Sequence, residues 1–241
     1  IRFNTDTANL EYFRGNTLGW SQFELVTPNL GGGTGSNTGL GTRMLIAGGF
    51  GSPSDTDVIQ FTTISTLGNS QDFGDLIDDR YNQAACSSRT RFISMGGFKV
   101  PNTLTNVIQF NTFASQGNSQ DFGDLTVDRG IPASTASSIR GLWAGGGVPG
   151  GVSDVIDYVT ILTTGAALDF GNLTVARKYF GGSGNETRGI FSGGDRAPGP
   201  ISDVIDFVTI ATAGNAQNFG DLTQARSGCS GVTDPTRFVV G

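Results

Sequence analysis

Apolar and polar residues alternate along several short segments of the chain. In residues 203–210, Val204, Asp206 and Val208 alternate with residues that would lie on the opposite face of an extended segment. A period of two, with many β-branched and aromatic side chains, is typical of a β-strand. Shorter apolar runs, such as 188–192, end at paired glycines and are followed by turn residues. The pattern therefore predicts an all-β protein built from short strands.

These strand signals recur with one period along the chain. Paired glycines stand at intervals of 48, 49 and 48 residues, at 48–49, 96–97, 145–146 and 193–194. A Val-Ile pair keeps the same period, at 58–59, 107–108, 155–156 and 204–205. A Phe-Gly-Asp tripeptide, Phe-Gly-Asn in the third copy, follows at 73–75, 122–124, 170–172 and 219–221. The shared period predicts repeats over about 43–90, 91–139, 140–187 and 188–236.

Each repeat contains four strand signals. They are a run that opens with Arg and ends at Gly-Gly, the Val-Ile segment, the Phe-Gly-Asp segment, and a run of small residues such as 227–231. Small residues suit an innermost strand, where sheets converge and space is short. Four antiparallel strands in 40–50 residues are typical of a β-propeller blade. We therefore expect residues 1–241 to form a single β-propeller domain.

The chain ends predict how this propeller closes. A fifth copy starts at 236–240, and Leu10 to Phe13 stand 33 to 30 residues before Arg43, as Val107 to Phe110 stand before Arg140. We therefore expect five blades, the fifth formed by residues 1–27 together with 226–241. Such closure would remove free sheet edges and hold both termini. The alternative is four blades with an N-terminal hairpin that docks elsewhere.

Composition narrows the range of partners. The 241 residues include 38 Gly and 17 Phe but only 15% charged residues, which favours a folded chain with many tight turns over a disordered one. A net charge of −6 without a Lys/Arg cluster argues against nucleic acid. No run of about 18 apolar residues occurs, so we expect no membrane insertion. The first residues, which lack Met, do not look like a signal peptide.

The chemistry available for catalysis is limited. The absence of histidine removes Ser-His-Asp and Cys-His catalysis and imidazole metal sites. Cys86 and Cys229 hold non-equivalent repeat positions, so we expect free buried thiols. The acids mostly recur with the repeat, whereas a glycosidase needs a unique acid and base in one pocket. We expect no enzyme, cofactor or metal, with calcium in an acidic loop as a less favoured alternative.

Recurring aspartates and arginines are interpreted as structural. The aspartates follow a Phe-Gly turn, where a carboxylate can accept backbone N–H bonds, at Asp75, Asp124 and Asp221. An arginine follows each turn, at Arg80, Arg129, Arg177 and Arg226. We expect these arginines to pair with the turn aspartates of their own or the next blade and so to fix blade registry. The alternative is a ring of guanidinium groups that binds an anion in the channel.

Ligand specificity is expected where the repeats differ. The loop after Gly-Gly varies most, and strand parity places it on one face with the segment that enters each inner strand. We call this the loop face and expect it to carry Phe50, Tyr81, Phe98, Lys99, Lys178, Tyr179 and Arg196. Aromatic and cationic side chains hold sugars or proteins by stacking and hydrogen bonding. The alternative is that these loop residues have no partner.

Two family resemblances follow from these motifs. The order Arg, strand, Gly-Gly, Val-Ile-x-Phe/Tyr, turn, aromatic and Arg resembles the kelch repeat. The kelch Tyr is matched by Phe61, Phe110, Tyr158 and Phe207, but Phe replaces the kelch Trp, so kelch partners are not carried over. The repeat, together with the opening segment 1–13, resembles more closely the virion proteins of tailed bacteriophages, especially those of marine and cyanobacterial phages.

The bacteriophage resemblance implies a place and a role. It implies a tail-fibre, adhesin or decoration module on the surface of the virion. Its partner would be a host surface glycan or protein, reached through the loops. Two alternatives remain, a structural virion part that packs on another virion protein and, less favoured, a glycan hydrolase.

Overall fold

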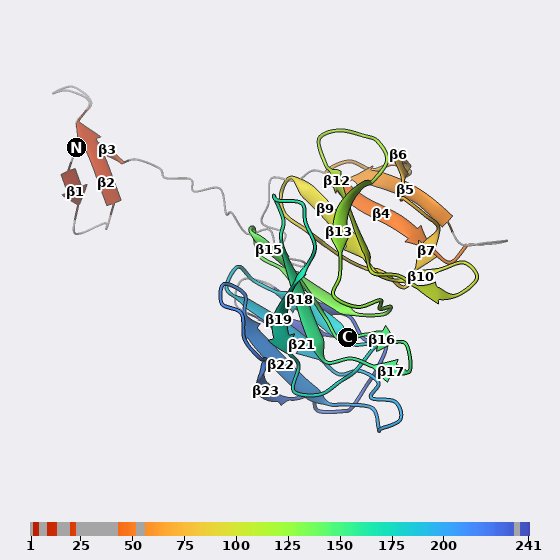
Figure 1. The fold of residues 1–241 in the computed structure, drawn as a ribbon. Helices are drawn as coiled ribbons and strands as arrows, with labels where there is room; N and C mark the ends of the chain where they lie inside the picture. The colour runs from red at the N-terminus through yellow and green to blue at the C-terminus, as the bar shows by residue number, and fades with distance from the viewer. Residues whose placement is uncertain (1, 5–8, 14–19, 23–42, 52–55, 234–236) are drawn as a thin grey trace.

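The computed structural model describes residues 2–4, 9–13, 20–22, 43–51, 56–233 and 237–241. These residues form short strands in several antiparallel sheets and contain no helix, which confirms the predicted all-β class (Figure 1). Consequently, no described segment is a helix long and apolar enough to cross a membrane.

Three four-stranded sheets share one strand order. Sheet 2 is β8–β9–β12–β13, formed by β8 (Ala84–Ser87), β9 (Arg91–Met95), β12 (Val107–Thr112) and β13 (Gln120–Asp124). Sheet 3 is formed by β14 (Ala133–Ala136), β15 (Arg140–Ala144), β18 (Val155–Thr160) and β19 (Leu168–Asn172). Sheet 4 is formed by β20 (Gly181–Gly184), β21 (Arg188–Ser192), β22 (Val204–Thr209) and β23 (Gln217–Asp221). The small-residue strand at the end of one repeat thus opens the next sheet.

Shorter sheets flank these three. Sheet 1 is formed by β4 (Arg43–Gly49), β5 (Thr56–Thr63) and β6 (Gln71–Asp75). At the other end, β24 (Gly231–Thr233) pairs with β25 (Phe238–Val240). Two small ladders join loops, one of β7 (Arg80–Tyr81), β10 (Phe98–Lys99) and β11 (Thr103–Leu104), the other of β16 (Gly147–Val148) and β17 (Gly151–Val152).

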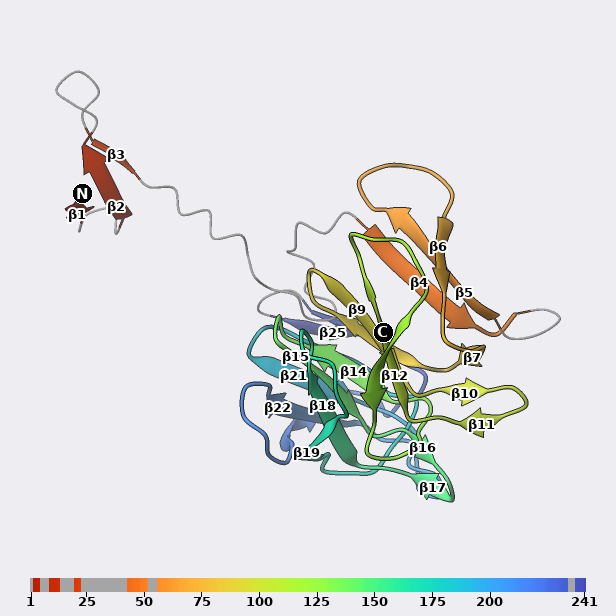
Figure 2. The same ribbon diagram turned by 45° about the horizontal axis from the view of Figure 1, so that its top comes forward.

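The two parts of the predicted closing blade are separate sheets. The N-terminal sheet is formed by β1 (Arg2–Asn4), β2 (Asn9–Phe13) and β3 (Trp20–Gln22), and both views draw it apart from the other sheets (Figures 1 and 2). Within it, β1 and β3 pair with the two edges of β2. Closure of a fifth blade by residues 1–27 with 226–241 therefore stays a prediction, and much of this range lies outside the described residues.

The small-residue strands of successive sheets lie against one another. Strand β14 contacts β8 and β20, and β20 contacts β24. Ser134 donates from Oγ to the carbonyl of Ala85, 2.7 Å away. A Cβ at Gly182 would lie only 2.7 Å from the carbonyl oxygen of Ser134. This close approach explains why the sequence keeps small residues in these strands.

The hydrophobic core lies between successive sheets. Trp143 of sheet 3 is fully buried in a cluster with Met95 and Phe122 of sheet 2. A second cluster joins Leu142 and Phe170 of sheet 3 to Phe191 of sheet 4. The sheets are thus held face to face by apolar side chains.

The recurring Phe-Gly-Asp segment, expected as a turn, instead lies within the outer strands β6, β13, β19 and β23, beside a register shift in each pairing. It connects the outer strands of neighbouring sheets. The loop before each outer strand donates a backbone N–H to the Phe carbonyl of the preceding sheet: Gly117 to Phe73 at 2.8 Å, Gly165 to Phe122 at 2.7 Å and Gly214 to Phe170 at 2.7 Å. We call this contact the outer latch. The glycine after each of these phenylalanines has a φ of +142° to +144°, a backbone conformation that L side chains rarely adopt.

Candidate functional site

The loop after Gly-Gly and the segment that enters the inner strand lie side by side. Tyr81 of β7 pairs with Phe98 of β10 in an antiparallel ladder. Equivalent bridges join Gly130 to Gly147 and Lys178 to Asp195. The ladders that contain β7, β10, β16 and β17 lie along one side of the body (Figures 1 and 2). Strand pairing therefore builds the loop face from both kinds of segment.

Three aromatic rings from three segments form the first part of this face. The Tyr81 ring stacks on Phe98, with centroids 5.4 Å apart and planes 22° apart. Phe50 meets Tyr81 edge to face at 6.0 Å and is 85% exposed. The Tyr81 hydroxyl donates to Asn102 Oδ1 at 2.9 Å. The arrangement presents an apolar ring face beside a fixed phenol group, as sites for sugars and peptides often do.

A glycine in the next sheet makes room for this stack. A Cβ at Gly130 would lie within 3 Å of both the Phe98 ring and the Leu104 side chain. The equivalent position is Tyr81, Lys178 or Ser227 in the other repeats. Glycine at this variable position therefore leaves the space that the Phe98 ring occupies.

Lys99 is tied into an ion network rather than extending freely into solvent. Its Nζ and the Arg80 guanidinium both bind the carboxylate of Asp78. Arg80 is fully buried while Asp78 and Lys99 are partly exposed. Burial lowers the pKa of Arg80, and the charge of Asp78 opposes that shift. Of the two charges that flank Asp78, only that of Lys99 reaches the surface.

A second cluster contains the other predicted face residues. The Lys178 ammonium lies 5.7 Å from the centroid of the Tyr179 ring, which is exposed. Arg196 directly follows Asp195, whose backbone exchanges two hydrogen bonds with Lys178. The seven predicted residues thus fall into two groups, one around Tyr81 and one around Tyr179.

The main chain fixes both groups through residues in the left-handed region. Asn82, Ile131, Tyr179 and Gly228 hold equivalent positions and have φ values of +54° to +68°. The N–H of Ile131 donates to the Asn82 carbonyl at 2.9 Å, and that of Gly228 to the Tyr179 carbonyl at 2.8 Å. A β-branched residue such as Ile131 is strained at positive φ. Asn82 and Gly228 carry a sequence signal for this conformation, because Asn and Gly adopt positive φ more readily than other residues. Ile131 and Tyr179 carry none, so the sequence analysis missed the shared position.

The recurring arginines form buried ion pairs, but not with the predicted aspartates. Arg129 Nη2 lies 3.0 Å from Asp157 Oδ2, and Arg177 Nη2 lies 2.9 Å from Asp206 Oδ2; all four side chains are fully buried. Pairing with the turn aspartates Asp75, Asp124 and Asp221 was therefore wrong. Arg129 and Arg177 instead reach the middle of the next sheet, to the residue after Val-Ile. We call this arrangement the arginine socket.

The aspartates of the Phe-Gly-Asp segments contribute to the outer latch through their backbone carbonyls instead. The Asp75 carbonyl accepts a bond from Ser119 N at 2.7 Å, and the Asp124 carbonyl one from Ala167 N at 2.8 Å. They lie on the outer strands, whereas the arginine side chains point into the space between sheets. Two separate sets of contacts, the outer latch and the arginine socket, thus hold neighbouring sheets in register.

The socket has two chemical forms. In sheets 3 and 4 a threonine supports the acid: Thr126 Oγ1 lies 2.8 Å from Asp157 Oδ1, and Thr174 Oγ1 lies 2.6 Å from Asp206 Oδ1. In sheet 2 the position of the acid is Gln109, which accepts a bond from Ile77 N at 2.9 Å. There Asp78 supplies the carboxylate to Arg80 from its own turn. The sequence contains the signal for this difference. Positions 77, 78 and 109 are Ile, Asp and Gln, whereas the equivalent positions 126, 127 and 157 are Thr, Val and Asp.

Burial sets the electrostatics of these sockets. It lowers the pKa of both Arg129 and Arg177, and the paired aspartates oppose the shift. Arg129 also donates to two carbonyls, those of Gly145 at 3.1 Å and Val155 at 2.8 Å. Each guanidinium directs its Nη1 and Nη2 bonds to the next sheet, while its Nε is buried without a hydrogen-bond partner. Buried groups held in this way argue against an anion site at Arg129 and Arg177.

The second recurring arginine stacks on an aromatic ring. Its guanidinium lies 4.5–5.0 Å above the ring of the next strand, in the pairs Arg43–Phe61, Arg91–Phe110, Arg140–Tyr158 and Arg188–Phe207. Arg91 also donates to the Ile161 carbonyl of the next sheet at 3.0 Å. These recurring arginines and aromatic rings therefore serve packing between and within sheets.

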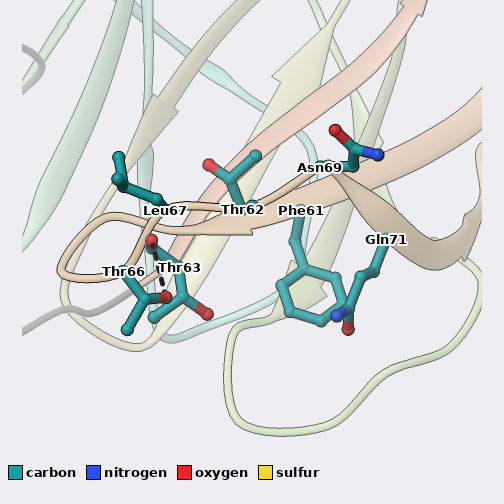
Figure 3. A pocket seen from close by; sticks show the side chains of 8 residues that line it. Phe61, Thr62, Thr63, Thr66, Leu67, Asn69 and Gln71 are labelled. Atoms are coloured by element: carbon teal, nitrogen blue, oxygen red, sulfur yellow. Dashed lines mark hydrogen bonds between the residues drawn. The ribbon is translucent and has the colours of Figure 1, made fainter.

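A pocket on sheet 1 offers no acidic chemistry. It lies under the turn between β5 and β6, and its lining includes Phe61, Thr66, Asn69 and Gln71 but no carboxylate (Figure 3). Groups of three or more His, Cys, Asp or Glu side chains placed to hold a metal do not occur among the described residues. Cys86 and Cys229 are free thiols, the first buried and the second partly exposed.

Comparison with known proteins does not assign the chain to a family. No protein-family model matches the chain, and the search of curated proteins gives no match.

Proposed function

We propose that the chain is a kelch-like β-propeller that binds a ligand through its loop face without catalysis. Sheets 1 to 4 would be four blades around one axis, and β24–β25 would be the inner half of a fifth. The inner strands β8, β14, β20 and β24 in contact support this arrangement. Closed propellers place variable loops at one end of a rigid ring.

The observation that carries the binding role is the exposed aromatic group at Phe50, Tyr81 and Phe98. Tyr81 is braced by stacking and a hydrogen bond, while Phe50 remains 85% exposed. Exposed aromatics held in fixed positions bind a sugar ring or an apolar side chain with little loss of conformational entropy. The second group offers a cation and an exposed ring in Lys178 and Tyr179.

The resemblance of the repeats to virion proteins supplies the setting of the proposal. We propose a tail-fibre, adhesin or decoration module at the surface of a tailed bacteriophage, whose partner is a host surface glycan or protein. The structural alternative is a virion part whose loop face packs on another virion protein. Both use the same surface, and they differ in whether the isolated chain binds host material.

The test is binding of the purified chain to immobilised glycans and to cyanobacterial cells. We expect saturable binding that Phe50→Ala and Tyr179→Ala each weaken at least about tenfold, as truncation of an aromatic anchor does. Leu67→Ala is the matched control, since Leu67 is fully exposed on the turn beside the pocket of Figure 3.

The outcomes separate the two virion roles. Binding that both face variants weaken and the control does not supports the adhesin. Absence of saturable binding to any glycan or cell would contradict it, and capture of another virion protein by the same face would favour the structural part.

A further inference from the structure

The outward side of sheet 4 carries half of an interface that the chain forms repeatedly. Each internal interface has an outer latch, an arginine socket and an apolar contact at the latch phenylalanine. Phe73, Phe122 and Phe170 are 2–3% exposed where a following sheet covers them. Phe219 holds the equivalent position in sheet 4 and is 53% exposed. Sheet 4 thus presents the residues of the contact without its covering partner.

The latch on sheet 4 lacks its donor. In sheet 3 the Phe170 carbonyl accepts a bond from Gly214 N, and the Asn172 carbonyl accepts one from Ala216 N at 2.8 Å. Apart from the ladder with β22, no described residue donates to the carbonyls of Phe219 or Asp221. A Cβ at Gly123 would collide with the Gly165 carbonyl, but one at Gly220 would meet nothing within 4 Å. Space for a covering loop is therefore present.

The socket on sheet 4 lacks its acid. Thr223 stands three residues before Arg226, as Thr126 does before Arg129 and Thr174 before Arg177. In both complete sockets the threonine and the arginine bind one aspartate. Arg226 is half-buried, and none of the described residues accepts a bond from its guanidinium. By comparison with the two complete sockets, the missing partner is a carboxylate that would lie between the Thr223 hydroxyl and the Arg226 guanidinium.

The missing carboxylate has a defined carrier. In sheets 2, 3 and 4 the second strand pairs on one side with the inner strand and on the other with the Val-Ile strand. In the last sheet β25 pairs with β24, and its other edge pairs with no described strand. A strand added there in the register of β22 on β21 would bring the residue after Val-Ile to Arg226.

We propose that Phe219, Arg226 and the free edge of β25 form a strand-acceptor site for a hairpin of this same repeat type. The hairpin carries Val-Ile-Asp in its first strand and a Gly-Asn turn before its second. Its first strand extends the β24–β25 sheet, its aspartate binds Arg226, and its turn closes the latch on Phe219. Binding by strand addition uses main-chain bonds for affinity and side-chain pockets for specificity.

The N-terminal sheet is not this hairpin in the structure described. Both edges of β2 are already paired, one with β1 and the other with β3, so neither edge is free to pair with β25. The strand-acceptor site is independent of the loop face, because none of its residues belongs to the two groups described there.

The test uses a synthetic peptide of residues 203–222, the β22–β23 hairpin with its Gly-Asn turn, and the whole chain. We expect saturable 1:1 binding by titration calorimetry and protection of the β25 amides from hydrogen exchange. Arg226→Glu is expected to weaken binding at least about 30-fold, the effect of breaking a buried charge pair. An Asp206→Arg peptide is expected to bind the parent chain weakly and the Arg226→Glu chain well. Leu67→Glu, which adds a negative charge at a fully exposed position on the distant sheet 1, is expected to leave binding unchanged.

Several results would overturn the proposal. They are a lack of saturable peptide binding, binding that Arg226→Glu leaves intact, or a stable dimer of the chain that the peptide does not dissociate. The loop-face experiment is unaffected by any of these, since it measures glycan and cell binding of a different surface.

Discussion

Arg177 and Asp206 join sheet 3 to sheet 4 through an ion pair of 2.9 Å in which both side chains are fully buried. Removing two charges from water costs free energy that their attraction barely repays. The guanidinium is further held by the carbonyls of Phe191 and Val204. Because the pair forms in only one register of the two sheets, its main effect is to fix that register.

Loss of one member of this pair is expected to be costly. Asp206→Asn should lower the free energy of unfolding by about 3–5 kcal/mol, because the charge of Arg177 is then left buried without compensation. Urea denaturation followed by tryptophan fluorescence measures the change. Asp78→Asn at the partly exposed socket of Arg80 is the comparison and should cost less. Equal losses at the two sites would contradict the assignment.

The two socket forms should be interchangeable as sets. Asp78→Val alone strips Arg80 of its carboxylate and should destabilise by about 2 kcal/mol, less than Asp206→Asn because Asp78 is partly exposed. The triple variant Ile77→Thr, Asp78→Val and Gln109→Asp rebuilds the Thr–Asp form and should return to within about 1 kcal/mol of the parent. Chemical denaturation of both variants tests the coupling, and a triple variant no more stable than the single one would refute it.

The latch glycines offer a test in which backbone strain is matched. Gly123 and Gly220 have φ values of +143° and +148°, so alanine is strained at either position by about 1–2 kcal/mol. Only at Gly123 does the added methyl also meet the next sheet. Gly123→Ala should therefore cost at least about 2 kcal/mol more than Gly220→Ala in thermal or urea unfolding. Similar costs would mean that the latch does not constrain the sheets.

Cys86 should make stability fall at alkaline pH. Burial raises the pKa of its thiol above the ordinary value of 9.0. The folded state therefore holds this proton more tightly than the unfolded state, so the stabilisation is complete below pH 9 and declines as pH rises above it. Between pH 9 and 10.5 the parent should lose stability more steeply than Cys86→Ala. Cys229→Ala, which removes the partly exposed thiol, serves as control and should follow the parent.

Thiol reactivity gives a second measurement of the same burial. Cys229 should react with a thiol-specific disulfide reagent in the native protein at pH 8, and Cys86 should react only at the rate of unfolding, because burial keeps it protonated and covered. Fast modification of Cys86 in the native state would contradict the structure.

Much of the fold could be predicted because the repeat reports the same signals four times. The alternation over 203–210 predicted β22. The small-residue run 227–231 predicted an innermost strand, but in the structure this strand, β24, begins only at Gly231 and continues to Thr233. Sequence did not reveal which aspartate an arginine would reach, because Asp124 and Asp157 are both plausible partners by spacing. Only the direction of the Arg129 side chain, into the space between sheets, decides that it reaches Asp157.

The loop face was predictable in outline but not in detail. Strand parity predicted that Tyr81 and Phe98 share a face, and their pairing in one ladder agrees with it. The support of the Phe98 ring by Gly130 and the positive φ of Ile131 depend on the neighbouring sheet, which no local pattern encodes. Whether this face binds a glycan or a protein stays a proposal.

The main-chain bonds from Ile131 to Asn82 and from Gly228 to Tyr179 separate the shape of the loop face from its chemistry. Because carbonyl and amide groups set the positions, the side chains at this rim can diversify without altering the frame that displays them. If the bound surface changes, substitutions at these positions can alter the ligand chemistry in one sheet at a time. The outer latches and arginine sockets keep the sheets in register meanwhile.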